Sequence, residues 1–243
     1  MDNLHFHTHI RQHIVVLTGA GISAESGLGT FRGEDGLWKH MDYKKLASSA
    51  GFEEDTEAAL AFYNHLRLQI SESVPNTAHK MLAELEQWHD VSIITQNVDD
   101  LHERAGSTNV LHLHGELKKV TSSIHRLDKQ YIEEYPLNKP ILVGDKAKDG
   151  SQLRPFVTMF GEYVTGINKA EKLIREADVF VIIGTSLTVH PANHLYRFAH
   201  SEIPCFVIDL ADMTAKLPDN FFHIKEKATL GVPILIQHLT DIL

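Results

Sequence analysis

The chain has 243 residues, of which 43% are hydrophobic and 23% charged, a balance typical of a globular protein with a buried core. The formal net charge of −9 argues against nucleic acid as a main ligand, because phosphate binding needs a basic face, and suits a partner with lysine-rich segments. No apolar run approaches the ~20 residues that span a bilayer, so no membrane partner is expected.

Cysteine and histidine limit the metal sites that the sequence allows. Cys205 is the only cysteine, which excludes an internal disulfide and a four-cysteine zinc site and suits a reducing, cytoplasmic location. The N-terminal segment lacks the apolar region of a secretory signal. His5, His7 and His9 alternate there and could share a metal, but we favour a solvated leader.

Short apolar runs alternate with helical patterns along the rest of the chain. Helices are predicted at residues 77–88, with Met81, Leu82 and Leu85 on one face, and at 168–177. Strands are predicted at residues 13–18, 91–95, 110–114, 178–183 and 204–208. Near-continuous apolar strands indicate a parallel sheet covered on both faces, and the alternation is typical of a doubly wound fold.

Two stretches interrupt this alternation and are predicted to form a small second lobe. Residues 35–75 look helical, and residues 116–153 are mixed, with a turn at residues 148–150. We therefore predict one domain over residues 1–243, of the α/β class, with a Rossmann-like doubly wound parallel sheet and a small inserted lobe. Its core would comprise residues 10–34, 76–115 and 154–243.

A glycine-rich loop follows the first predicted strand. The run from Gly19 to Ala24 fits the dinucleotide-binding pattern G-x-G-x-x-A, in which glycines let the main chain approach a pyrophosphate. A helix is expected to follow, with its N-terminal N–H groups directed at the phosphates. On this motif alone, a tight turn without a ligand stays an alternative.

Several motifs in the same order resemble those of the sirtuin family. They are GAGISAESGLGTFR at residues 19–32, TQNVD at 95–99, LHG at 113–115, RP at 154–155, FGE at 160–162, GTS at 184–186 and PA at 191–192. The resemblance implies an enzyme that uses NAD to remove acyl groups from protein lysine, releasing nicotinamide and O-acyl-ADP-ribose. The physical pattern agrees, because ligands bind beyond the carboxyl ends of parallel strands, and most of these motifs follow predicted strands.

The resemblance also implies roles for single residues. Asn97 and His114 would be catalytic, with Asn97 shaping the nicotinamide pocket and His114 acting as general base, a task that suits the pKa of histidine. His112 alternates with His114, but His114 is favoured because Gly115 follows it. The residues expected to bind NAD are Gly19, Ala20, Gly21, Ser23, Phe31, Arg32, Gln96, Asn97, Asp99, Gly184, Thr185, Ser186, Asp209 and Ala228.

The acyl-lysine peptide would, by the same resemblance, add as a strand between the loops at residues 160–162 and 188–190. The carbonyl of Thr158 would accept from the acyl-lysine N–H. The enzyme is expected to act as a monomer. The residues expected to bind this substrate are Tyr63, Leu66, Val157, Thr158, Phe160, Gly161, Glu162 and Val189.

The inserted lobe departs from the family pattern. Most sirtuins carry a four-cysteine zinc ribbon between the His-Gly and Arg-Pro pairs, whereas residues 117–153 contain no cysteine and one histidine, His125. No zinc or other metal is therefore expected. Gly29, Met159 and Asp209 also replace more usual residues. The lobe would instead be held by packing of Ile124, Leu127, Tyr131, Ile132, Tyr135, Leu137 and Ile141.

The helical insertion bears on the choice of acyl group. Sirtuins that remove acidic acyl groups carry a Tyr-x-x-Arg pair, and here Tyr63 is followed three residues later by Leu66. Arg67 would point about 100° away around an ideal helix, toward solvent. An uncharged acyl group, acetyl or a longer aliphatic chain, is therefore expected.

Three other functions were weighed against deacylation. A protein ADP-ribosyltransferase or an NAD hydrolase would keep the same cofactor site, and the peptide cleft is the feature that separates them. A non-catalytic NAD-sensing module would not need His114, Asn97 and Asp99 together. A hydride-transfer dehydrogenase is disfavoured because the sequence offers no substrate-polarising pair beyond the dinucleotide pattern.

Overall fold

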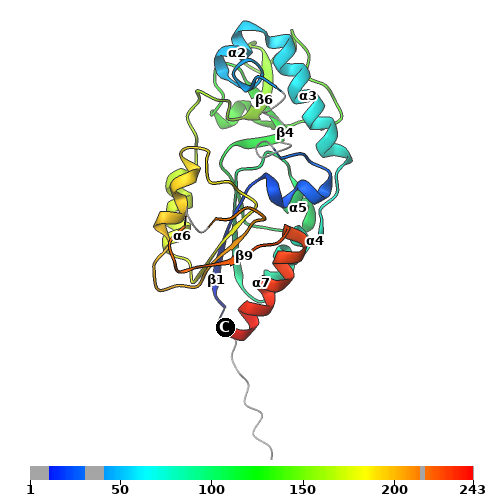
Figure 1. Ribbon diagram of the computed structural model, residues 1–243. Helices are drawn as coiled ribbons and strands as arrows, with labels where there is room; N and C mark the ends of the chain where they lie inside the picture. The colour runs from blue at the N-terminus through cyan, green and yellow to red at the C-terminus, as the bar shows by residue number, and fades with distance from the viewer. Residues whose placement is uncertain (1–10, 31–40, 214–216, 243) are drawn as a thin grey trace, which may run out of the picture.

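The structure is a computed structural model that describes residues 11–30, 41–213 and 217–242. Figure 1 shows a larger part built on one sheet and a smaller part beyond one end of that sheet. The sheet has six strands in the order β3-β2-β1-β7-β8-β9, and every pairing is parallel. Its strands are β1 (His13–Thr18), β2 (Asp90–Thr95), β3 (Val110–His112), β7 (Val179–Ile183), β8 (Cys205–Ile208) and β9 (Phe221–Ile224).

Helices cover both faces of this sheet, which is why its strands are apolar throughout. Ile14 and Val16 of β1 pack with α4 (Thr77–Leu85) and α7 (Ala228–Ile242), whereas Val15 and Leu17 pack with α6 (Ile167–Arg175) and the 3-10 helix η5 (Ala192–Phe198). The short helix α5 (Leu101–Ala105) joins β2 to β3. Among the described residues, no helix has the length and apolar character needed to cross a membrane.

The smaller part combines helices with an antiparallel sheet. Its helices are α1 (Tyr43–Leu46), α2 (Ser49–Glu54) and α3 (Thr56–Glu72), and its three strands, in the order β5-β4-β6, are Glu133–Glu134, Gly115–Ser122 and Leu153–Val157. The helix α3 begins where the Asp55 carboxylate accepts from the Ala58 N–H, a side-chain cap. Leu60 of α3 and Leu117 of β4 share one buried cluster with Ile141, which joins the two insertions.

The α/β class and the doubly wound parallel sheet predicted from the sequence are confirmed. The turn at residues 148–150 is also present. The elements that were not predicted include β4, β6, β9, α5 and α7, and β3 ends at His112 rather than His114. The expected boundary at residue 154 falls inside β6, because the Arg154-Pro155 segment pairs with β4.

The helix expected after the glycine loop is absent from the described residues. Two 3-10 turns, η1 (Ala20–Ile22) and η2 (Ala24–Ser26), stand there instead, and Gly27 ends the second in a left-handed conformation. Glycine and serine are poor helix formers, and this segment is rich in both. The segment directly after β1 is therefore made of 3-10 turns and not of an α-helix.

Four of the residues expected to pack the lobe lie outside its buried cluster, namely Ile124, Leu127, Tyr131 and Ile132. Ile124 is 71% exposed and Leu127 is 44% exposed, because the chain between them turns outward after β4. Ile141 is fully buried, and Tyr135 and Leu137 pack against the same cluster. The lobe is therefore centred on α3 and β4.

Arg67 was predicted to face solvent, and this is wrong. Its side chain is fully buried on the stripe of α3 that also carries Tyr63 and Ile70. The guanidinium donates to the carbonyl of Leu117 and, at 2.6 Å, to the carbonyl of Pro136. Burial lowers its pKa to about 10, which still leaves it charged at neutral pH. Arg67 is buried because the antiparallel sheet and the loop before Ile141 cover a second side of α3.

We predict that Arg67→Ala destabilises the protein by about 3 kcal/mol or more, because it leaves buried carbonyl oxygens without a donor. For a chain of this size the melting temperature should fall by roughly 6–12 °C. The control is Leu68→Ala on the same helix, where the side chain is 47% exposed and little change is expected. Equal melting temperatures for the two variants would contradict a stabilising role for Arg67.

Candidate active site

The glycine loop after β1 meets the end of β7 where the strand order reverses direction. The Gly21 N–H donates to the carbonyl of Gly184 at 2.9 Å. A Cβ on Gly21 would lie 2.6 Å from the Cα of Gly184, whose φ of 61° is itself left-handed. Both positions therefore require glycine, and the contact presents main-chain groups at the edge where ligands of such sheets bind.

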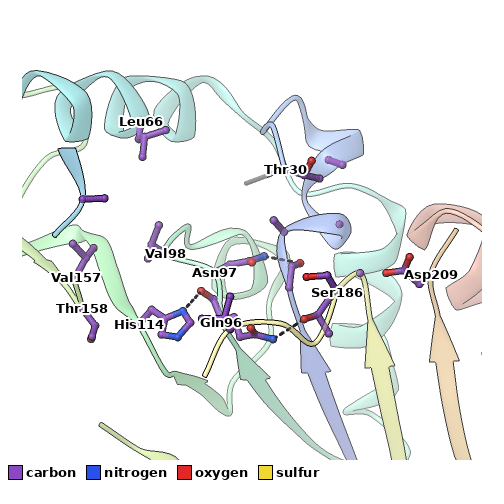
Figure 2. A pocket seen from close by; sticks show the side chains of 18 of the residues that line it. Thr30, Leu66, Gln96, Asn97, Val98, His114, Val157, Thr158, Ser186 and Asp209 are labelled. Carbon is purple, nitrogen blue, oxygen red and sulfur yellow. Dashed lines mark hydrogen bonds between the residues drawn. The ribbon is translucent and has the colours of Figure 1, made fainter. Parts of the chain in front are cut away.

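A pocket of about 640 Å³ opens at this edge and extends toward the smaller lobe. Figure 2 shows Ser186 and Asp209 on one side of His114, and Leu66, Val157 and Thr158 on the other. The volume of the pocket is that of a site for a cofactor or a small substrate. The expected residues that line it are Gly19, Ala20, Gly21, Tyr63, Leu66, Gln96, Asn97, His114, Val157, Thr158, Phe160, Gly161, Glu162, Gly184, Thr185, Ser186, Val189, Asp209 and Ala228.

The middle of the pocket is fixed by hydrogen bonds between the ends of neighbouring strands. The Gln96 side-chain amide donates to the Thr185 hydroxyl at 2.9 Å, which joins the segment after β2 to the segment after β7 (Figure 2). The carbonyl of Gln96 lies 2.9 Å from His114 Nδ1. Gln96 thus ties His114 to the segment after β7 through its own side chain and main chain.

His114 is held in one tautomer by this contact. Because the carbonyl of Gln96 can only accept, Nδ1 carries the ring proton, and Nε2 is the basic nitrogen. Burial lowers the pKa of His114 below its usual value. The imidazole is therefore neutral at physiological pH and able to accept a proton.

Ser23 and Asp99 do not line the main pocket but a smaller cavity of about 40 Å³ behind it, which also touches Asn97. The Asn97 side-chain amide donates to the carbonyl of Gly19 at 3.1 Å and to the Ser23 hydroxyl at 3.3 Å. The Ser23 hydroxyl in turn donates to Asp99 Oδ2 at 3.1 Å. Burial raises the pKa of Asp99. The arrangement offers amide and carboxyl groups to a small planar amide.

The end of the pocket near α3 is mainly apolar. Tyr63 and Leu66 reach it from α3, and Val98 and Val157 reach it from the segments after β2 and in β6. Arg67, next to Leu66, is directed instead at carbonyl groups of the lobe. The described lining at this end therefore suits an uncharged chain.

The loop after β6 is anchored by two arginines. Arg154 binds Glu162 at 2.6 Å, and Arg126 lies 3.3 Å from the same carboxylate. Arg126 also donates to the Thr158 hydroxyl at 3.3 Å and to the carbonyl of Tyr163 at 2.8 Å. Sequence analysis missed Arg126, which lies in the cysteine-free insertion where only packing residues were sought.

The same loop is partly occupied by main-chain pairing. The Phe160 N–H donates to the carbonyl of Ala47 at 2.9 Å, and the Phe160 carbonyl accepts from Ser49 at 3.0 Å. A peptide strand added at this loop would therefore have to pair with Gly161 rather than Phe160. Gly161 has a φ of 93°, a conformation that favours glycine.

Other lining residues were missed because α7 was not predicted. Glu226 and Lys227 line the pocket just before α7, beside the expected Ala228. Glu25 also lines it, and its carboxylate accepts from the Thr229 N–H at 3.1 Å and the Thr229 hydroxyl at 2.8 Å. These bonds tie the glycine loop to the first turn of α7.

Phe31 and Arg32, both expected to bind the cofactor, lie outside the described residues, as do His5, His7 and His9. Within the described part of the chain, Glu103, His112 and Glu116 bring ligand-type atoms within 4.8 Å of one another. However, His112 Nε2 bonds Glu103 at 2.7 Å and Lys119 Nζ bonds Glu116 at 2.5 Å. We therefore describe this group as an ion-pair network.

Comparisons with known proteins agree with this geometry. The model of the Sir2 family matches residues 19–191. An NAD-dependent protein deacylase of Helicobacter pylori is 47% identical over 230 residues, which cover 95% of this chain and 98% of the relative. A solved Sir2 homolog–NAD complex matches with a TM-score of 0.82 and 36% identity, covering 95% of this chain and 90% of that one. Sir2Af2 bound to a myristoylated histone peptide matches with a TM-score of 0.70 and 28% identity, covering 95% and 92%.

We predict that Gly184→Ala destabilises the protein by about 1–3 kcal/mol more than Gly27→Ala. Both glycines have positive φ, so both substitutions incur the same backbone penalty. Only at Gly184 would the new Cβ meet main-chain atoms, 2.6 Å from Gly21 Cα, whereas nothing lies within 4 Å at Gly27. Urea unfolding of the two variants measures the difference, and equal stabilities would refute the close contact.

Proposed function

Because this chain belongs to the Sir2 family and is an NAD-dependent protein deacylase, we propose that NAD and the acyl-lysine meet in the long pocket, on opposite sides of His114. The observation that carries this proposal is the position of a neutral, partly buried histidine between a glycine-lined end and an apolar end of one pocket. The acyl group and the NAD ribose could then both reach the same base.

The glycine-lined end fits NAD. At Gly19 and Gly21, a Cβ would enter the main chain of Gly184 or the side chain of Thr185, so the glycines hold the loop in close contact with the end of β7. The Gly19 and Gly21 N–H groups donate to the carbonyls of Ile183 and Gly184, and this close packing leaves the loop main chain at the mouth of the sheet, where a pyrophosphate would bind. Asp209, which lines the far end, would accept from ribose hydroxyls.

The small cavity behind Asn97 would take the nicotinamide. The nicotinamide carboxamide can donate to Asp99 and accept from neighbouring amides. Asn97 and Ser23 support this arrangement, because the Asn97 amide donates to the Ser23 hydroxyl and that hydroxyl donates to Asp99. When bound, NAD supplies the anomeric carbon that the acyl oxygen attacks as nicotinamide departs. Gln96, already donating to Thr185, would accept from a ribose hydroxyl through Oε1.

His114 would act as the general base for that ribose. Its Nδ1 is held by the carbonyl of Gln96, so Nε2 is the nitrogen that would take a proton from the attacking hydroxyl. The acyl-lysine side chain would enter from the side of Val157 and Thr158, with its peptide pairing between Gly161 and Val189.

We also infer that the protein substrates present basic segments. The enzyme is proposed to act as a monomer, in the cytoplasm. The net charge of −9 supports the first inference, since opposite charge speeds association. The single buried cysteine is compatible with a reducing compartment.

We predict that His114→Ala lowers kcat for deacylation by at least ~10²-fold, because general-base catalysis is lost. The assay is nicotinamide release from NAD with and without an acetyl-lysine peptide, and His65→Ala, an exposed position, is the control. The wild type should also keep its kcat/KM to a pH below the usual pKa of histidine. Above the usual pKa of histidine the His114 imidazole is fully neutral, and the neutral form is lost only as the pH falls through the lowered pKa of His114.

Two results would contradict this proposal. Near-normal deacylation by His114→Ala would show that another group is the base. Nicotinamide release that does not depend on the peptide would favour NAD hydrolysis over acyl transfer as the activity of this pocket.

We predict a preference for uncharged acyl groups, because Leu66 stands in the pocket and Arg67 is bound to lobe carbonyls. A buried carboxylate without a cation would be costly. Compare kcat/KM for acetyl-, fatty-acyl- and succinyl-lysine peptides of one sequence. Leu66→Arg should gain succinyl activity, whereas Leu68→Arg, which adds the same charge outside the pocket, should not. A wild type that favours succinyl-lysine would overturn the preference.

A further inference from the structure

Two histidines bind two successive carbonyls of the segment after β2. His114 Nδ1 lies 2.9 Å from the carbonyl of Gln96, and His112 Nδ1 lies 3.1 Å from the carbonyl of Asn97. The two rings stand at alternate positions of one extended segment. Each of the two carbonyls in the segment after β2 therefore has its own imidazole donor. The main chain of Gln96 and Asn97 is thereby fixed at both of its carbonyls.

The second nitrogen of His112 is also engaged. Its Nε2 lies 2.7 Å from Glu103 Oε1 on α5, and the His112 side chain is only 7% exposed. A backbone carbonyl and a carboxylate are both acceptors, so the two contacts together require a proton on each ring nitrogen. Glu103 and Glu116 favour this charged form and raise the pKa of His112.

We propose that His112, oriented by Glu103, is a positioning residue for the nicotinamide end of the site, where it holds the main chain from which the Asn97 side chain reaches the cleft. The bond to the Asn97 carbonyl is charge-assisted and therefore stronger than one between neutral groups. Asn97 turns its side-chain amide to Gly19 and Ser23, and Ser23 binds Asp99. Rotation of the Asn97 peptide would disturb all three contacts.

This inference rests on the proposed binding of nicotinamide at Asn97 and Asp99. It differs from a purely structural role because the carbonyl that His112 binds belongs to a residue lining both cavities. His114 contacts the neighbouring carbonyl, so loss of His112 should change how nicotinamide and NAD bind more than it changes proton abstraction.

Two substitutions separate the two bonds of His112. In His112→Asn, Nδ2 is bonded to Cγ as Nδ1 is in histidine, so a donor to the Asn97 carbonyl is kept and the bond to Glu103 is lost. In His112→Gln, Nε2 lies as many bonds from Cα as the histidine Nε2, so a donor to Glu103 is kept and the bond to Asn97 is lost. The melting temperature of each variant controls for folding.

We expect His112→Gln to raise the KM for NAD and the inhibition constant of nicotinamide by about tenfold, the effect of losing one hydrogen bond to a charged group. Its kcat should change much less. His112→Asn should restore both constants to within about threefold of the wild type. Equal constants in the two variants, or wild-type constants in His112→Gln, would overturn the proposal.

A separate measurement tests the proposed nicotinamide site itself. Asn97→Ala should weaken nicotinamide inhibition if that site is correctly assigned. If Asn97→Ala leaves nicotinamide inhibition unchanged, the assignment of the nicotinamide cavity fails. If Asn97→Ala weakens inhibition and His112→Gln does not, only the positioning role of His112 fails.

Discussion

Gly21 donates a main-chain hydrogen bond to the carbonyl of Gly184, and the two glycines lie so close that neither could carry a side chain. This contact joins the loop after β1 to the end of β7, the two central strands at which the strand order reverses. Thr185, one residue beyond, accepts from Gln96, so the segment after β2 is brought to the same place. The end of the pocket proposed for NAD therefore depends on two residues without a side chain, Gly21 and Gly184.

From that contact a chain of hydrogen bonds extends across the pocket toward the substrate end. Gln96 links Thr185 to His114, and the Thr158 N–H donates to the carbonyl of His114 at 2.8 Å. His114, the proposed base, is thus attached on one side to the segment after β7 and on the other to Thr158, the residue expected to meet the acyl-lysine. Fixed donors and acceptors of this kind reduce the reorganisation that the reaction would otherwise require.

The sequence predicted much of this arrangement because its signals are local. Gly19, Asn97 and Gly184 each follow an apolar strand, and parallel strands bring their carboxyl ends together. The family, its use of NAD and deacylation were predicted from the motifs and are confirmed. The roles of the single residues remain predictions. Phe222, half exposed in β9, and the mixed apolar face of α7 carry no clear period, which is why both elements were missed.

The smaller lobe was the least predictable part, because polar contacts between distant segments add to its hydrophobic cluster. Arg67 on α3 binds carbonyls of β4 and of the loop at Pro136, and Asn64, one turn earlier, donates to the carbonyl of Ile141 at 2.8 Å and accepts from its N–H at 2.9 Å. Such bonds leave no periodic trace in a sequence.

Polar contacts between distant segments also hold the loop after β6. Arg126 projects from the cysteine-free insertion to Thr158 and Glu162, so this insertion also orders the wall of the pocket at the end proposed for the acyl-lysine. Glu162 is held by Arg126 and Arg154 and accepts from the Met159 N–H at 2.8 Å, and these contacts shape the loop. In this chain, the buried Arg67 and Arg154 and the partly buried Arg126 therefore reinforce the hydrophobic cluster of the lobe with charge-assisted hydrogen bonds. Arg126 and Arg154 also hold the end of the pocket that lies away from the contact between Gly21 and Gly184.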